Sequence, residues 1–270
     1  MTEGIEKITV VKIGGNVVDN PVALDKFAAD FANLSGKKIL IHGGGKEATR
    51  LSARLDIPTT MIEGRRVTSA ETLEIVTMVY GGLINKRVVA ALQNHGCNSI
   101  GLSGVDGMII PAKRRSPVPV DYGFVGDIAT NDINVGVIKV LLDSGLTPVF
   151  CALAYDSAGS TLLNCNADSI ASSVAVAASR IAPTSLTFCF EKDGVMTDVD
   201  NPDTLIPSIT PDSFDTFRAN GTVTGGMIPK ITNALAAIRN GVCEVRICRS
   251  DLLASDRGTV ITIPDHESYR

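Results

Sequence analysis

Residues 8–15 read Ile8-Thr9-Val10-Val11-Lys12-Ile13-Gly14-Gly15, an apolar run of strand length that ends in a lysine and two glycines. A second apolar run leads into Ile41-His42-Gly43-Gly44-Gly45, and a helical pattern follows it. Apolar runs that alternate with helical patterns are typical of a parallel sheet with helices on both faces. Ligands of such sheets gather at the carboxyl ends of the strands. The sequence therefore predicts an α/β fold with a site at these glycines.

The alternation continues through most of the chain. Besides Ile8–Ile13, the expected strands are Lys38–Ile41, Ser99–Leu102, Thr147–Ala152, Ser185–Phe190 and Glu244–Cys248. The expected helices are Val22–Leu34, Glu47–Leu55, Ala70–Asn94, Asn134–Leu142, Ala167–Ala178 and Ile228–Asn240. Met61–Val67 and Asp106–Ile128 predict hairpins outside the main sheet, placed to cover a substrate. Asp193–Thr222 predicts a long loop with short elements, and a boundary between two parts is expected near residue 180.

Composition narrows the class of partner. The net charge is −4 and no long basic block is present, which argues against nucleic acid or an anionic membrane as a partner. No targeting segment is expected at the acidic N-terminus, and no run approaches the roughly 18–20 apolar residues of a membrane span. The six cysteines form no C-x-x-C pair, which predicts buried free thiols in a reducing cytoplasm. The three histidines are scattered, and we expect no metal site made of protein ligands.

A second lysine with glycine neighbours lies near the C-terminus, in Gly225-Gly226-Met227-Ile228-Pro229-Lys230. Lysines beside closely approachable backbone suit phosphoryl transfer, because cations and N–H groups stabilise the transferring oxygens. Neither a Walker A pattern nor a protein-kinase signature is present. The alternative for Lys12 is a surface lysine at a strand end. A first-turn lysine such as Lys230 opposes the helix dipole, so a structural role is less natural for it.

Other polar groups at predicted turns have a functional and a structural interpretation. Arg65 and Arg66 follow a short strand, where they could grip a carboxylate or be a solvated pair. Asn164–Asp168 opens a helix, where its polar side chains are either N-caps or site residues. Gly81 and Gly82 lie inside a long predicted helix, where a dimer contact and a plain core position are equally compatible.

Seven segments, in register over nearly the whole chain, together resemble the amino acid kinase family. They are Lys12–Gly15, His42–Gly45, Arg66–Thr68, Gly82–Lys86, Gly101–Gly104, Asn164–Asp168, and Gly225–Met227 with Lys230. The resemblance implies an open αβα sandwich with a mainly parallel central sheet of about eight strands. It also implies phosphorylation of the γ-carboxylate of N-acetyl-L-glutamate by ATP, in arginine biosynthesis. Residues 1–180 are then expected to bind the acylated amino acid and to form a homodimer, and residues 181–270 to bind ATP.

The resemblance also implies roles for single residues. The implied catalytic residues are Lys12 and Lys230, which stabilise the transferring phosphoryl group, and Asp168, which holds both lysines in place. The implied substrate-binding residues are Gly44, Gly45, Arg66 and Asn164. The implied nucleotide-binding residues are Lys12, Gly14, Gly15, Gly194, Met227 and Lys230. Mg²⁺ is expected to arrive with ATP, without protein ligands.

The chain departs from the family pattern at two places. The family usually has an apolar residue before its substrate arginine, where this chain has Arg65. We take Arg65 as a further substrate-binding candidate, because a second cation could accept an acyl group that carries its own carboxylate, as in N-succinyl-L-glutamate. The alternative is that Arg65 points to solvent. The family often reads Thr-Asp-Val-x-Gly-Val where this chain has Phe190-Glu191-Lys192-Asp193-Gly194-Val195, so the nucleotide contacts there are expected to differ.

Three other functions compete with this interpretation. Aspartate, glutamate 5- and carbamate kinases belong to the same family, but the pairing of Arg66-Val67-Thr68 with Asn164–Asp168 favours an N-acylated glutamate. A catalytically silent amino-acid sensor on the same fold is disfavoured by the intact lysines. A nicotinamide oxidoreductase is disfavoured because no dinucleotide fingerprint is present. Eleven residues precede Lys12, too few for the N-terminal helix of arginine-inhibited family members, so we expect an arginine-insensitive enzyme.

Overall fold

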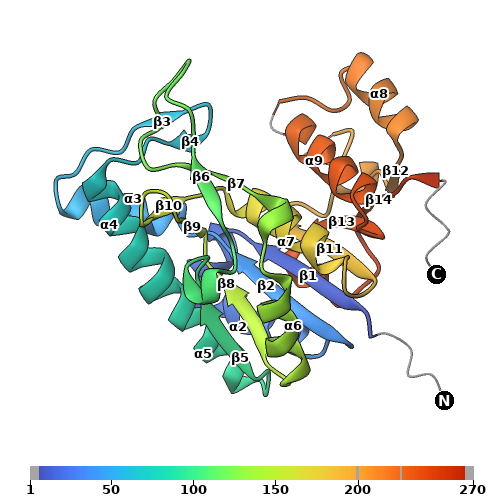
Figure 1. Cartoon of the computed structure of the whole chain (residues 1–270). Coiled ribbons are helices and arrows are strands. Elements are labelled where there is room, and N and C mark those ends of the chain that lie inside the picture. The colour runs from blue at the N-terminus through green and yellow to red at the C-terminus, as the bar shows by residue number, and fades with distance from the viewer. Residues whose placement is uncertain (1–5, 199–200, 226, 265–270) are drawn as a thin grey trace.

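A central sheet of eight strands organises the computed structural model, which describes residues 6–198, 201–225 and 227–264 (Figure 1). The strand order is β12-β14-β13-β11-β1-β2-β8-β5. The strands are β1 (Ile8–Ile13), β2 (Lys37–His42), β5 (Ser99–Leu102), β8 (Thr147–Phe150), β11 (Thr184–Phe190), β12 (Ser208–Ile209), β13 (Glu244–Arg249) and β14 (Thr259–Ile261). All pair in parallel except β13 with β14. The predicted fold class is confirmed, and the six predicted strands are all present.

The topology of the sheet reverses at its centre. From β1 the chain builds β2, β8 and β5 on one side, and it later adds β11 on the other side of β1. The crevice at such a reversal is where open parallel sheets bind ligands. Lys12 lies near the carboxyl end of β1, and Phe190 ends β11. The sheet runs without interruption through the boundary expected near residue 180, because β11 pairs directly with β1.

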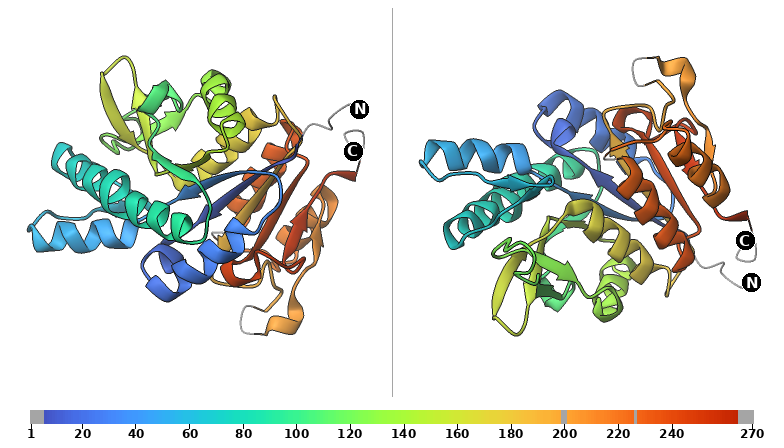
Figure 2. Two further views of the ribbon diagram at one scale, coloured as in Figure 1. Left: turned by 90° about the horizontal axis from the view of Figure 1, so that it is seen from below. Right: turned by 90° about the horizontal axis from the view of Figure 1, so that it is seen from above.

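Helices cover both faces of the sheet (Figure 2). One layer contains α7, which packs on β1 and β11, together with α6 and α9; α2 and α5 belong to the opposite layer. The helices are α1 (Gly15–Val18), α2 (Pro21–Ala32), α3 (Gly45–Arg54), α4 (Ala70–Val76), α5 (Asn85–Asn94), α6 (Val135–Asp143), α7 (Ala167–Ala178), α8 (Pro211–Ala219) and α9 (Met227–Arg239). Short 3₁₀ turns lie at η2 (Asp106–Met108), η3 (Thr130–Asp132), η4 (Pro202–Thr204) and η5 (Ser250–Leu252). Sequence analysis missed α8 and the short α1.

The long predicted helix at Ala70–Asn94 is continuous, but its middle, η1 (Thr77–Ile84), is a π-helix. π-helical turns are rare and frequently lie at functional sites. Within η1, Tyr80 and Ile84 are buried, whereas Gly82 is exposed and a Cβ added there would meet no atom within 4 Å. The core interpretation is therefore wrong for Gly82. By length and composition this helix could cross a membrane, but its buried face packs on α2 and the sheet, as a core helix does.

Three hairpins stand outside the main sheet. They are β3 (Met61–Ile62) with β4 (Arg65–Arg66), β6 (Ala112–Arg114) with β7 (Gly126–Ile128), and β9 (Leu153–Asp156) with β10 (Thr161–Asn164). The first two confirm the predicted hairpins; the third was not expected. Isolated bridges tie them to one another, with Val125 beside Asn164 and Pro111 beside Tyr155. All six cysteines are free thiols, and five of them are buried, the exception being Cys243.

Candidate active site

Lys12 is held by an ion pair at the carboxyl edge of the sheet. Its ammonium Nζ lies 2.8 Å from Oδ1 of Asp168, and both side chains are largely buried. Asp168 stands in the first turn of α7, where the helix dipole stabilises a carboxylate. The N-cap of that helix is Asn166, whose side-chain oxygen accepts hydrogen bonds from the backbone N–H groups of Asp168 and Ser169. The carboxylate and its lysine are thus fixed from two elements.

Lys230 reaches the same place from the first turn of α9. Its Nζ lies 3.7 Å from the ring centroid of Phe190, and Nζ of Lys12 lies 5.5 Å from the same centroid. Burial lowers the pKa of Lys230; the charge of Asp168 opposes this effect and the charge of Lys12 adds to it. The structure therefore brings together Lys12, Lys230 and Asp168, although in the described residues Asp168 forms its ion pair with Lys12 and none within 4.0 Å with Lys230.

The two glycine segments line the space beside these lysines. A Cβ on Gly14 would lie 3.7 Å from Nζ of Lys12, and the N–H of Gly43 donates to the carbonyl of Ile13, which joins the two segments. Gly45 begins α3, so its N–H has no partner within the helix and can face a ligand. Gly44 must be glycine for a packing reason, since a Cβ there would lie 2.4 Å from Cδ1 of Ile84.

His42 contacts the backbone of the glycine loop, residues 43–45, from the buried side. Its Nδ1 lies 2.8 Å from the carbonyl oxygen of Gly43, and its Nε2 lies 3.1 Å from Nδ2 of Asn85. The amide of Asn85 also donates to the carbonyl of Val149. Complete burial lowers the pKa of His42 to about 4. A neutral imidazole that donates from Nδ1 and accepts at Nε2 satisfies this arrangement, so His42 orders the loop rather than carrying protons.

A cavity of about 200 Å³ opens next to the glycine loop. All five predicted substrate residues line it, namely Gly44, Gly45, Arg65, Arg66 and Asn164. Sequence reasoning missed several other residues of its wall: Met61, Gly64, Tyr80, Val125, Ala152, Cys165, Asn166 and Ala167. Met61 and Gly64 belong to the β3–β4 hairpin and Tyr80 to η1, and only the three-dimensional fold brings these segments to the cavity. Ala167 is adjacent to Asp168, so the cavity adjoins the lysine pair.

Arg66 is anchored before any ligand arrives. Its guanidinium donates to the carbonyl of Gly45 at 2.9 Å, and to the hydroxyl groups of Thr49 at 2.7 Å and Thr59 at 3.2 Å. Asn164 is likewise buried, and its amide donates to Oγ1 of Thr68 at 3.0 Å. Their orientations are therefore set by the α3 N-terminus and by the strand-like segment 66–68. This preorganisation suits recognition of a carboxylate by arginine and amide donors.

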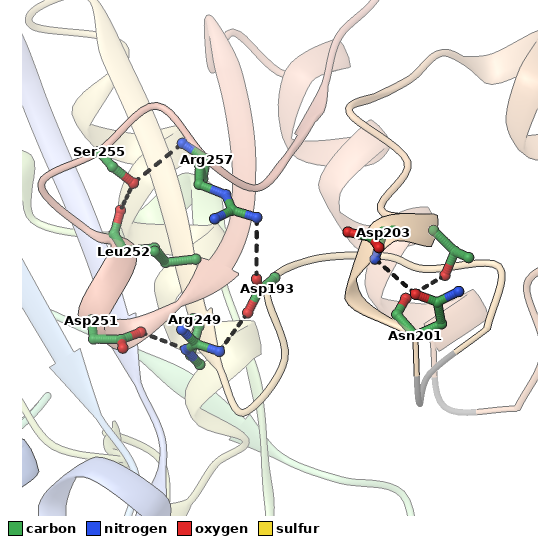
Figure 3. A network of polar contacts seen from close by, with 9 residues as sticks. Asp193, Asn201, Asp203, Arg249, Asp251, Leu252, Ser255 and Arg257 are labelled. Carbon is green, nitrogen blue, oxygen red and sulfur yellow. Dashed lines mark hydrogen bonds and ion pairs between the residues drawn. The ribbon is translucent and has the colours of Figure 1, made fainter.

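The loop that follows β11 is fixed by a separate ionic network (Figure 3). Asp193 lies 2.7 Å from a guanidinium nitrogen of Arg249 and 3.8 Å from one of Arg257. Arg249 also pairs with Asp251 at 2.6 Å. The carboxylate of Asp193 is thus engaged with Arg249, which ends β13, and with Arg257, in the loop before β14.

Two predicted nucleotide residues flank this part of the site. A Cβ on Gly194 would lie 2.6 Å from Oγ1 of Thr259, so close packing accounts for this glycine. Met227 begins α9 and is half-buried, and Gly226 before it lies outside the described residues. Contacts of either residue with a nucleotide stay a prediction. In the described part of the chain, no three His, Cys, Asp or Glu side chains are grouped as metal ligands would be.

Comparison with known proteins tests the family resemblance drawn from the sequence. The model of the amino acid kinase family matches residues 7–249, which include the lining of the cavity and both lysines. The chain belongs to the amino acid kinase family. It is 46% identical to the acetylglutamate kinase of Phocaeicola vulgatus, over 95% of this chain and 98% of that protein. It is 47% identical to the acetylglutamate kinase of Cytophaga hutchinsonii, over 92% of this chain and 94% of that protein. The resemblance inferred from the seven segments is confirmed.

Solved structures share the fold. Smu.665 from Streptococcus mutans UA159 superposes with a TM-score of 0.75 at 27% identity, covering 94% of this chain and 98% of that one. N-acetylglutamate synthase from Neisseria gonorrhoeae, solved with coenzyme A and N-acetyl-glutamate, gives a TM-score of 0.78 at 23% identity, over 94% of this chain and 59% of the synthase. The second likeness concerns the fold alone.

Proposed function

We propose that this protein transfers the γ-phosphoryl group of ATP to the γ-carboxylate of N-acetyl-L-glutamate. One observation carries the proposal: a cavity with preorganised arginine and amide donors adjoins two ammonium groups at one edge of the sheet, that of Lys12, which is largely buried, and that of Lys230, which is half-buried. The relatives named acetylglutamate kinase, which match along nearly the whole chain, support the same reaction.

The cavity is the acceptor site in this proposal. Arg66 and Asn164 bind the α-carboxylate end of the acylated amino acid, and the N–H groups of Gly44 and Gly45 face its γ-carboxylate. The γ-carboxylate is already ionised at pH 7, so no general base has to remove a proton. The neutral, buried state of His42 is compatible with this chemistry.

The transfer itself needs charge stabilisation more than covalent chemistry. A γ-carboxylate oxygen forms a bond to the γ-phosphorus as the bond from that phosphorus to the bridging oxygen of ADP breaks. Lys12 and Lys230 stabilise the negative charge that shifts toward the leaving ADP, and the Gly14 and Gly15 N–H groups hold phosphate oxygens. Asp168 keeps Lys12 oriented. Mg²⁺ accompanies ATP and neutralises its phosphates.

The two parts of the chain divide the work in this proposal. Residues 1–180 hold the acceptor cavity, and residues 181–270 bind ATP through the segment after β11, with Gly194, and through the start of α9, with Met227 and Lys230. The support is that every residue lining the cavity lies between Gly43 and Ala167.

The acyl group is the finer question, and it depends on Arg65. Arg65 is half-buried and lines the cavity beside Arg66, and its charge acts on Cys165 of the same wall. A second cation there favours an acyl group that ends in a carboxylate, so N-succinyl-L-glutamate is the alternative substrate. The names of the relatives favour the acetyl group.

The test measures ADP release with Mg-ATP and, side by side, N-acetyl-L-glutamate, N-succinyl-L-glutamate and L-glutamate, with hydroxylamine to trap the acyl phosphate. Turnover of an acylated substrate without turnover of glutamate supports the kinase. Comparison of wild type with Arg65→Leu then decides the acyl group, because a succinyl-binding role lowers only the succinyl rate. Silence on all three substrates with intact ligand binding overturns the proposal in favour of a sensor.

We further propose that the protein is a cytoplasmic homodimer in which η1 contributes to the interface. Met78 and Leu83 are large, exposed apolar side chains on either side of the open Gly82, which supports a contact there. Buried free thiols suit a reducing compartment. Light scattering of wild type and Met78→Glu tests the dimer: a monomeric wild type contradicts it.

A further inference from the structure

We infer that Phe190 is a positioning residue for phosphoryl transfer, whose ring face holds the ammonium of Lys230 beside that of Lys12. This inference rests on the proposed function, since it assigns the two lysines to the transferring phosphoryl group. Phe190 stands where the chain departs from the family pattern, so its role follows from the contacts of this chain.

The geometry is that of one aromatic face shared by two cations. The ring centroid lies 3.7 Å from Nζ of Lys230 and 5.5 Å from Nζ of Lys12. A cation within about 6 Å of a ring centroid is attracted by the negative face of the ring. Both ammonium groups fall inside this range.

The two lysines depend on the ring to different degrees. Lys12 has the carboxylate of Asp168 at 2.8 Å. For Lys230, the described residues provide no hydrogen bond and no ion pair within 4.0 Å. The cation–π contact with the Phe190 ring is therefore the close electrostatic contact of its ammonium group. A lysine side chain loses rotamer freedom when it is held in one position. The ring attraction offsets part of this loss for Lys230.

The ring is itself well fixed. Phe190 ends β11, where it pairs with Arg249 of β13. Its ring stacks on that of Phe188, with the ring centroids 6.0 Å apart and an angle of 22° between the ring planes. Phe188 is buried in the sheet opposite Lys12 of β1. The sheet therefore fixes the position of the Phe190 ring, and the ring in turn positions Lys230, which comes from α9.

The ring also acts on the charge of Lys230. The groups that face this ammonium are Asp168 of α7, Lys12 of β1 and Glu191 after β11, and burial lowers its pKa. Leucine at position 190 keeps an apolar neighbour but removes the negative ring face. The charged form of Lys230 then loses stabilisation, so its pKa falls further.

The experiment compares Phe190→Leu and Phe190→Tyr with wild type over pH 7–10.5. We expect Phe190→Leu to lower kcat about fivefold, in the range of cation–π energies, and to leave KM for the acylated glutamate unchanged. The alkaline limb of the profile of kcat against pH should move about half a pH unit lower in Phe190→Leu. Phe190→Tyr should have the kcat and the alkaline limb of the wild type. Phe31→Leu is the matched control, since Phe31 also lies under a lysine, Lys38, at 5.7 Å, but far from the site in the fold.

A second measurement does not depend on turnover. The pH dependence of Lys230 labelling by acetic anhydride, followed by mass spectrometry, reports the pKa of the amine directly. It should be lower in Phe190→Leu than in wild type, Phe190→Tyr and Phe31→Leu. Phe190→Met serves as a second ring-free variant if the leucine protein does not fold.

The outcomes separate the two proposals. An unchanged alkaline limb and an unchanged Lys230 pKa in the ring-free variants, or failure of tyrosine to restore them, overturn the role of Phe190. If wild type phosphorylates no acceptor, the proposed function fails, while the labelling curve still decides whether the ring holds Lys230.

Discussion

The acceptor cavity and the lysine pair share one edge of the sheet, but the protein holds them in different ways. Arg66 makes three hydrogen bonds to its surroundings, and Asn164 is tied to Thr68. Lys12 has one carboxylate partner, and Lys230 contacts an aromatic face. In the proposed function, the acceptor side is thus built before any ligand arrives, whereas the phosphoryl side holds its two cations with fewer contacts.

The difference follows from what each side must do. A cavity that selects one acyl amino acid gains from rigid, fully bonded donors, because an ordered site loses less entropy on binding. Cations that act on a transition state contribute most when their interactions strengthen as charge develops. Substitutions on the two sides should therefore separate into effects on KM for the acceptor and effects on kcat.

The largest effect is expected from the lysines. Lys12→Met and Lys230→Met should each lower kcat about 10²–10³-fold, as loss of a transition-state charge partner does, with KM for the acylated glutamate changed less than about threefold. Steady-state kinetics with both substrates measures this. A large rise in acceptor KM in either variant breaks the separation between the two sides.

Stability should also distinguish the lysines. Lys12→Met leaves the carboxylate of Asp168 without its partner, so it should destabilise the fold by about 1–3 kcal/mol. Lys230→Met removes a lysine for which the described residues provide no such carboxylate partner, and it should destabilise the fold less. Urea denaturation of the two variants makes the comparison, and equal losses would contradict it.

Arg66→Lys sharpens the other side of the comparison. Lysine keeps the charge but cannot reproduce the planar fork that reaches Gly45 and Thr49. KM for the acceptor should rise about 50-fold with kcat nearly unchanged, consistent with loss of about 2 kcal/mol of binding. Arg54→Lys, at the exposed end of α3, is the matched control and should leave KM unchanged.

The elements of the fold also differ in how well they could be predicted from the sequence. Strands buried on both faces give continuous apolar runs, so β1, β2, β5, β8, β11 and β13 were found. Strands β12, at the edge of the sheet, and β14, beside it, span two and three residues, too short for any pattern. Helix α8 begins with a Thr210–Ser213 capping box inside a polar, proline-containing segment, which hid it.

The site residues divide in the same way. Those of the acceptor side lie in compact local segments, such as the triglycine and the paired arginines. The resemblance to the family, with Arg65 as a departure from it, singled out all five, and the structure has all five lining one cavity. Phe190 and Tyr80 gave no such signal, because their contacts exist only after β11 meets α9 and η1 meets the glycine loop. Phe190 was visible only as a departure from the family pattern.

A smaller effect is expected from the packing beneath the glycine loop. Gly44→Ala puts a Cβ against Ile84 and Tyr80 at 2.4 and 2.9 Å, and overpacking of this kind should destabilise by about 1–3 kcal/mol. Gly43→Ala meets only Cβ of Ala167, at an ordinary 3.8 Å, and should destabilise by less than about 1 kcal/mol. Urea denaturation of both alanine variants measures the difference. Equal destabilisation would mean that the loop shifts freely, and the acceptor side would then not be prebuilt.

The smallest effect concerns the histidine under the same loop. The pKa of His42 is lowered to about 4 in the fold, below its ordinary value of 6.5, so the unfolded chain binds more protons between these limits. Stability then rises with pH across this window and is lost as pH falls, and the His42 contribution from pH 7 to pH 5.5 should be a loss of about 1 kcal/mol. His42→Gln removes this titration. The free energies of unfolding at the two pH values, measured by urea denaturation, should therefore differ by about 1 kcal/mol less in the variant than in the wild type. If the free energy of unfolding of His42→Gln depended on pH as in the wild type, the imidazole would not be kept neutral beneath the loop. The acceptor side would then be less rigid than its hydrogen bonds imply.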